Sequence, residues 1–297
     1  MKKGKAGNLN SLATRHPVIA YYFVTFLISW GGLVLMLGGP KSISSQPTNF
    51  PFLPLYLVTV AGPCIGGVLL TGIFDGKKGY RDFVSRLIKW RVKGKWYAAA
   101  VLMAPVTVFT TLLVLSLFSP AFIPGIFRTG QNPVATAFGI PGGDTMTLFL
   151  FVLMLGLFNG FVEELGWTGF ATPKLRMKHS VMATGVNLGI AWGLWHLLSN
   201  YIGSAAGAGT FPLPLYLLVM LFSFLPPFRI IMAWVYDQTG SLFIGILMHA
   251  SLDVFWILAT PIALTGSQRV VWYIAWSVVL WGIVVAIMKV ANQKKNN

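Results

Sequence analysis

The chain alternates between long apolar runs and short polar connections. The apolar runs cover about 18–38, 53–74, 96–118, 146–171, 182–201, 212–236, 240–260 and 270–291. Most of them have the roughly 20 residues that a helix needs to cross the hydrocarbon core of a bilayer. The pattern therefore predicts an all-α, polytopic transmembrane helix bundle of about eight spans. Pro226 and Pro227 predict a kink or break within the sixth span.

The composition agrees with a protein whose solvent is largely lipid. Hydrophobic residues make up 56% of the 297 positions and charged residues only 10%, whereas about a quarter of the residues of a soluble domain are charged. The lone cysteine, Cys64, excludes an internal disulfide and a cysteine-rich metal site. The lipid bilayer is the first partner that the sequence implies.

Apart from Arg229 in the sixth run, the lysines and arginines that give the net charge of +15 lie in the connections between spans and at the two ends of the chain. Four lysines and arginines precede the first span, eight lie between residues 77 and 95, three between 174 and 178, and three between 289 and 295. The opposite side carries only Lys41, Arg128 and Arg269. Eighteen against three is the positive-inside pattern, which predicts a multi-pass protein of the cell membrane with both termini in the cytoplasm. This distribution excludes nucleic acid as a partner.

Five acidic and histidine side chains fall inside the predicted spans, where they are costly. The only two glutamates of the chain, Glu163 and Glu164, are adjacent within 148–170, while His196 lies in another span and His249 and Asp253 in a third. A carboxylate within a membrane costs at least a few kcal/mol, so such residues indicate a functional site. In helix bundles, sites are built from side chains on facing helices.

The spacing of these residues suggests separate roles. His249 and Asp253 are four residues apart and share one helix face, so the carboxylate can fix the imidazole tautomer. Glu163 and Glu164 point about 100° apart on a helix, so only one of them needs to face a cavity. Taken singly, these residues also fit helix–helix hydrogen bonds or, in a transporter, a proton or cation site.

Three short motifs resemble the CPBP family of intramembrane glutamic endopeptidases, which includes type II CAAX prenyl endopeptidases and bacteriocin-processing and self-immunity proteins. Residues 163–170 read EELGWTGF, Trp192 stands four positions before His196, and His249 four before Asp253. The resemblance covers about 146–258. It divides the chain into 1–145, with a cytoplasmic tail, three spans and the basic loop, a protease core at 146–258, and a last span and cytoplasmic tail at 259–297.

The resemblance implies an endopeptidase that hydrolyses membrane-associated peptides or proteins entering from the membrane or the cytoplasm. Glu163, assisted by His196, would activate a water, and His249 and position 253 would stabilise the oxyanion. Because an ionised aspartate donates no hydrogen bond, we expect Asp253 to orient a protonated His249 that supplies the donor. Glu164 and Trp192 are expected to support the site.

The chain departs from the family motif at Thr168, where the family has arginine. Thr168 lies four residues after Glu164 on the same face. Without that arginine, Glu164 must be protonated, paired with another residue, or held by backbone groups. The change leaves open a non-proteolytic immunity or scaffold protein, and a proton-coupled transporter is a further alternative. No cofactor is favoured; a zinc ion on Glu163, His196 and His249 is the alternative. Substrate identity, its prenylation and the oligomeric state stay open.

Overall fold

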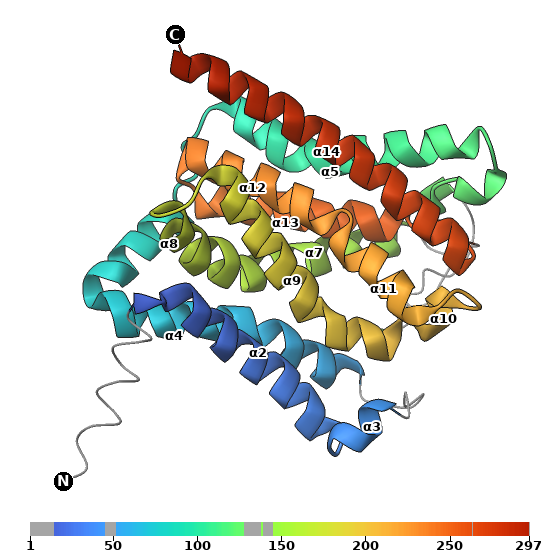
Figure 1. Cartoon of the computed structure of the whole chain (residues 1–297), viewed down its shortest axis with the longest axis horizontal. Helices are drawn as coiled ribbons and strands as arrows, with labels where there is room; N and C mark the ends of the chain where they lie inside the picture. The colour runs from blue at the N-terminus through green and yellow to red at the C-terminus, as the bar shows by residue number, and fades with distance from the viewer. Residues whose placement is uncertain (1–14, 45–51, 128–137, 139–144, 263, 297) are drawn as a thin grey trace.

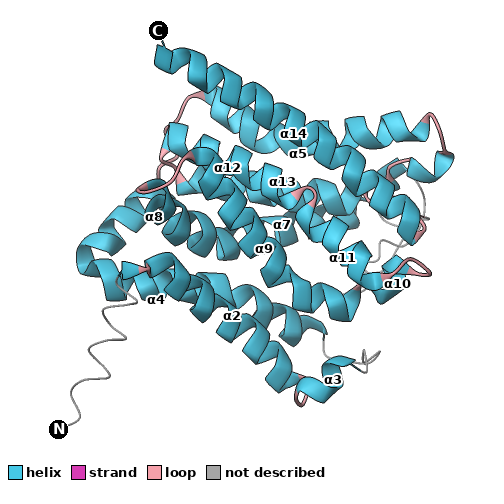
Figure 2. Cartoon of the chain, in the orientation of Figure 1, coloured by secondary structure: helices cyan, strands magenta, loops and turns pink. Residues whose placement is uncertain are grey.

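The computed structural model describes residues 15–44, 52–127, 138, 145–262 and 264–296, and it contains only helices and their connections there (Figures 1 and 2). Lys2, Lys3, Lys5 and Arg128, which enter the charge count above, lie outside these residues. Within the described part, eight segments are long and apolar enough to cross a membrane. The predicted all-α bundle of eight spans is confirmed.

The spans follow the apolar runs closely. Five of them are single helices, α2 (Pro17–Met36), α5 (Gly94–Ser116), α9 (Val181–Gly203), α13 (Leu242–Ala259) and α14 (Gly266–Asn296). Short helices α3 (Pro40–Ser44) and α10 (Ala205–Ala208) and the single turns Pro120–Phe122 and Gly125–Phe127 lie in connections. Side chains on the outer faces are exposed and apolar, for example Phe23 and Met154, each 66% exposed. Such a surface is stable only against lipid.

The second span is the first part of a longer element, α4 (Phe52–Leu87). Its backbone leaves the helical region at Gly76, where φ is 59°, a conformation that glycine adopts without strain. The first half of the basic connection is therefore helical rather than a loop. Asp75 of this element pairs with Lys174 at 2.8 Å, and a separate ion pair joins Arg176 to Asp237, also at 2.8 Å.

The predicted break in the sixth span is confirmed. It consists of α11 (Leu213–Phe222) and α12 (Leu225–Thr239), separated at Ser223 and Phe224. Pro226 lies in the first turn of α12, where its missing N–H has no intrahelical partner to lose. The break allows α12 to carry Arg229, which is 1% exposed, to the centre of the bundle.

Helix α13 is the central element, packing against α5 and against α7 (Thr145–Gly166). Small residues permit the close contact with α7. A Cβ atom at Gly160 would lie 2.6 Å from the carbonyl oxygen of Ile246, so a larger residue would force the two backbones apart. Gly160 precedes Glu163 by one turn, and Ile246 precedes His249 by one turn. The close approach thus brings these two side chains together.

Candidate active site

The two glutamates lie in the last turn of α7, immediately before a π-helical turn at Trp167–Ala171 and the short helix α8 (Thr172–Arg176). The hydroxyl of Thr172 donates to the carbonyl of Trp167, five residues earlier, at 2.8 Å. Glu163 is 2% exposed and Glu164 is not exposed at all. Since their side chains point apart, each carboxylate has its own set of partners.

Glu164 is paired with Arg229 of α12. The guanidinium donates to both carboxylate oxygens, with Nη1 2.9 Å from Oε2 and Nη2 2.7 Å from Oε1. The hydroxyl of Thr168 also donates to Oε2. Of the alternatives considered for a glutamate lacking the motif arginine, the structure shows pairing with another residue. A guanidinium from the sixth span thus supplies the positive charge that Thr168 cannot.

His249 is held by the same carboxylate. Its Nδ1 lies 2.6 Å from Oε1 of Glu164. Because an arginine-paired carboxylate accepts hydrogen bonds, Nδ1 carries the hydrogen of this contact. The other ring nitrogen, Nε2, faces two further carboxylates, and it lies 3.6 Å from Oδ1 of Asp253 and 4.0 Å from Oε2 of Glu163. The closest carboxylate contact of the imidazole is thus Glu164, and not Asp253 as the i, i+4 spacing suggested.

Glu163 is fixed by Trp192, whose indole N–H donates to Oε2 at 2.9 Å. The same indole ring lies under the guanidinium of Arg229, whose central carbon is 4.0 Å from the ring centroid. Its edge meets the ring of His249 at a centroid distance of 5.0 Å. Trp192 therefore contacts both halves of the acidic cluster, which is more than the packing role typical of a tryptophan in a span.

Asp253 is fixed from a different direction. The amide of Asn159, one turn before Glu163 on α7, donates to Oδ2 of Asp253 at 2.8 Å. The hydroxyl of Tyr56 on α4 donates in turn to the side-chain amide oxygen Oδ1 of Asn159. This chain of hydrogen bonds holds the Asp253 carboxylate beside Glu163. His196 completes the group from α9, with its ring against those of Trp192 and Trp195 at 5.6 and 4.5 Å.

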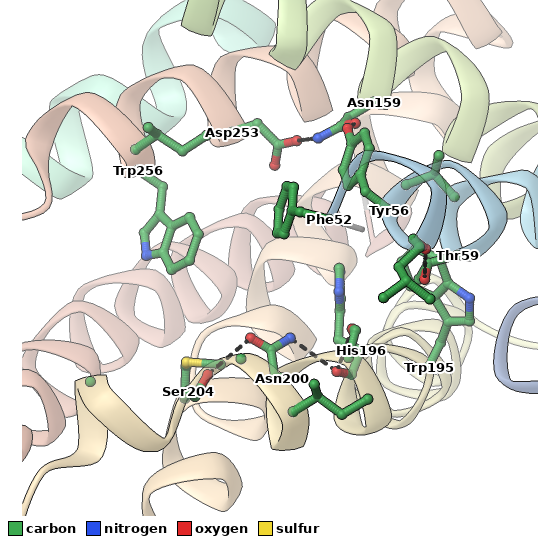
Figure 3. Close-up of a pocket in the computed structure, with 18 of the residues that line it drawn as sticks. Phe52, Tyr56, Thr59, Asn159, Trp195, His196, Asn200, Ser204, Asp253 and Trp256 are labelled. Carbon is green, nitrogen blue, oxygen red and sulfur yellow. Dashed lines mark hydrogen bonds between the residues drawn. The ribbon is translucent and has the colours of Figure 1, made fainter. Parts of the chain in front are cut away.

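A cavity of about 640 Å³ adjoins this cluster. Glu163, His196 and Asp253 line it, whereas Glu164 and His249 do not. In Figure 3, Asp253 and Asn159 lie on one side of the cavity and His196 and Asn200 on the other. Two acids and an imidazole from three helices thus face one space inside an apolar bundle. Glu164, Arg229 and His249, which contact one another, do not line this space.

The sequence motifs named six of the principal side chains, including Trp192, and the structure adds three. Arg229, Asn159 and Tyr56 were not predicted as site residues. Signals for two of them were present, because Arg229 is a lone arginine within a span and Asn159 precedes Glu163 by one helical turn. Nothing in the spacing of Tyr56 marked it. Among the described residues, no three His, Cys, Asp or Glu side chains are grouped so as to hold a metal ion.

Comparison with known proteins converges on the same helices. Residues 145–255 match the family model described as type II CAAX prenyl endopeptidase Rce1-like. The expected resemblance to the CAAX prenyl endopeptidases is confirmed. The chain is also 23% identical over 237 residues to CAAX prenyl protease 2 of Methanococcus maripaludis, covering 79% of this chain and 82% of that protein. The similarity to this CAAX protease extends well beyond the three motifs and supports a multi-pass membrane peptidase.

Proposed function

We propose that the protein is an intramembrane endopeptidase in which Glu163 activates a water molecule for attack on a peptide bond. The observation that carries this proposal is the position of Glu163. Its carboxylate is buried within the bundle, fixed by the indole of Trp192, and lines a cavity shared with His196 and Asp253. The match to CAAX endopeptidases over these helices supports the same reaction class.

In the proposed reaction, the Glu163 carboxylate accepts a proton from a water in the cavity while the water oxygen attacks the peptide carbonyl carbon. His196 assists by hydrogen bonding to that water. The developing oxyanion accepts hydrogen bonds, for which His249, oriented by Glu164, is the proposed donor. Collapse of the intermediate breaks the C–N bond, and the proton on Glu163 passes to the leaving nitrogen. The products are a carboxylate and an amine.

We propose that no metal takes part, with zinc as the alternative. Nδ1 of His249 contacts Glu164, and Arg229 places a positive charge on that same carboxylate. The Arg229 charge beside His249 disfavours a second cation there, whereas the Nδ1 contact leaves Nε2 of His249 available as a ligand. Metal analysis of the purified, active protein together with exhaustive chelation tests this. Loss of cleavage on chelation with restoration by zinc would support the metal mechanism.

The experiment for the function itself is cleavage of membrane-associated reporter peptides by the purified protein in lipid. Glu163→Gln and His196→Ala are expected to lower cleavage by about 10²–10⁴-fold, the usual contribution of a general acid–base group, while both variants keep the wild-type melting behaviour. Unchanged cleavage in Glu163→Gln would refute the proposed role. An unaltered host phenotype for both variants at normal expression would favour the scaffold or immunity alternative, for which the missing motif arginine was the only sequence feature.

A further inference from the structure

The cavity that contains Glu163 lies toward one particular end of the bundle. It is lined by the later turns of α2, α9 and α13, which are the first, fifth and seventh spans, and by the early turns of α4, α11 and α14, which are the second, sixth and eighth. The fourth span, α7, adds Leu155, Asn159 and Glu163 from its second half. Because consecutive spans cross the membrane in opposite directions, the ends of odd spans and the beginnings of even spans lie on the same side. That side is opposite to the start of α2 and the end of α14. Figure 1 shows the start of α2 and the end of α14 on one side and α3 and α10 on the other.

The lysine and arginine distribution identifies the two sides. Eighteen of these residues flank the ends on the side of the termini, and three flank the opposite ends. An excess of this size in short connections marks the cytoplasmic side. The end of the bundle where the cavity is found is therefore the one that faces away from the cytoplasm.

We propose that the site receives its substrate from the extracytoplasmic side of the membrane. The proposal rests on the proposed function for the nature of the reaction, and on helix direction and charge for the side. It differs from the family resemblance, which implied that the substrate enters from the membrane or the cytoplasm. The substrate class that follows is a peptide segment of a secreted or membrane-anchored protein exposed outside the cytoplasm.

The side is tested by cysteine labelling, which does not depend on enzymatic activity. In a Cys64→Ser background, Gly203→Cys places a thiol in the cavity wall, where no other atom lies within 4 Å of the new Cβ. Lys178→Cys is the matched control on the exposed turn between α8 and α9. A membrane-impermeant maleimide applied to intact cells should label Gly203→Cys and leave Lys178→Cys unlabelled until lysis. Labelling of Lys178→Cys in intact cells, or none of Gly203→Cys, would overturn the proposal.

A second feature of this cavity points to the chemistry of the substrate. Arg269, in the first turn of α14, lines the cavity near Tyr216 and Tyr273. Its side chain hydrogen-bonds to that of Tyr273, but its buried Nε has no hydrogen-bond partner, and no described acid lies within 4.0 Å of its guanidinium. Glu163 and Asp253, the described acids that line the cavity, have hydrogen-bond partners of their own. A guanidinium that pairs with no described carboxylate and faces a largely apolar cavity is a binding group for an anion.

We infer that Arg269 binds a carboxylate of the substrate, which is either its free C-terminus or an acidic side chain. Binding is measured on the catalytically disabled Glu163→Gln protein, so the result does not depend on cleavage. Three peptides are compared: one with a free C-terminus, its C-terminal amide, and the amide with an added glutamate. A carboxylate should strengthen binding by about tenfold or more, the effect of one charged hydrogen bond.

Adding Arg269→Gln to the disabled protein should remove this preference, while Arg269→Lys should retain part of it. The peptide series identifies which carboxylate is bound. Retention of the full preference in Arg269→Gln, or equal binding of all three peptides to the parent protein, would refute the inference. Loss of the preference in Arg269→Gln with unchanged binding of the plain amide excludes a general folding defect.

Discussion

Replacing Arg229 by alanine leaves the carboxylate of Glu164 inside the bundle without its guanidinium. Both side chains are buried, at 1% and 0% exposure, and two charged hydrogen bonds of 2.7 and 2.9 Å are lost. Removing one partner of a buried pair costs about 3–5 kcal/mol. At about 2 °C per kcal/mol for a chain of this size, the apparent melting temperature should fall by about 6–10 °C. Because Glu164 also holds His249, cleavage should fall at least tenfold, about 1.4 kcal/mol.

The decisive variant restores a guanidinium to Glu164 from position 168 instead of position 229. Thr168 lies one turn after Glu164, and its hydroxyl already contacts that carboxylate. An arginine at position 168 therefore has the carboxylate within reach once Arg229 is shortened. The double variant Thr168→Arg/Arg229→Ala should recover part of both the melting temperature and the cleavage rate. Thr168→Arg alone should destabilise the protein, because it buries a second cation beside one carboxylate.

The assay is a thermal melt in detergent and a cleavage rate in lipid, measured on the four proteins of this cycle. Arg229→Lys is the control that keeps the positive charge but loses the planar, bidentate guanidinium. Relative to Arg229→Ala, it should recover less stability and less cleavage than the arginine at position 168 does. If the double variant is no more stable and no more active than Arg229→Ala, then Arg229 does not substitute for the motif arginine. The reasoning on Glu164 would then be refuted.

Three further predictions concern neighbouring residues. Trp192→Phe keeps most of the ring but removes the N–H that fixes Glu163, so cleavage should drop about tenfold with little change in melting temperature; an unchanged rate would show that this hydrogen bond is dispensable. Asp253→Asn should keep substantial cleavage and Asp253→Ala should lose much more, and equal losses would exclude a positioning role for this side chain. Gly160→Ala inserts a methyl group 2.6 Å from a backbone oxygen of α13 and should cost about 1–3 kcal/mol in a thermal melt. Gly282→Ala on α14, with nothing within 4 Å, is the matched control, and an equal effect of both would contradict the close-packing argument.

Several properties of this protein follow from the sequence alone. The number of spans is readable because the cost of leaving backbone and polar groups in hydrocarbon acts on each segment separately. The same local cost singles out Glu163, Glu164, His196, His249 and Asp253 among the residues of the spans. The break before α12 is likewise local, since it depends on the prolines in that segment.

The partners within the site depend on tertiary structure. Arg229 is 65 residues from Glu164, and Asn159 is 94 residues from Asp253. Which of these groups meet is decided by the rotation and the depth of the helices that carry them. Those quantities are set by close contacts such as that of Gly160 with the backbone of α13. The i, i+4 spacing gave His249 a neighbour on its own helix, but a closer carboxylate arrives from α7 at 2.6 Å.

Thr168 illustrates the difference most clearly. The sequence shows that a guanidinium is missing four residues after Glu164, and a local reading leaves that carboxylate without its expected partner. The tertiary structure supplies the charge from another span. The physical reason is that a buried carboxylate requires a cation at hydrogen-bond distance, but the requirement fixes the position of the charge and not the helix from which it comes. Helix packing decides that origin, and no single segment encodes it.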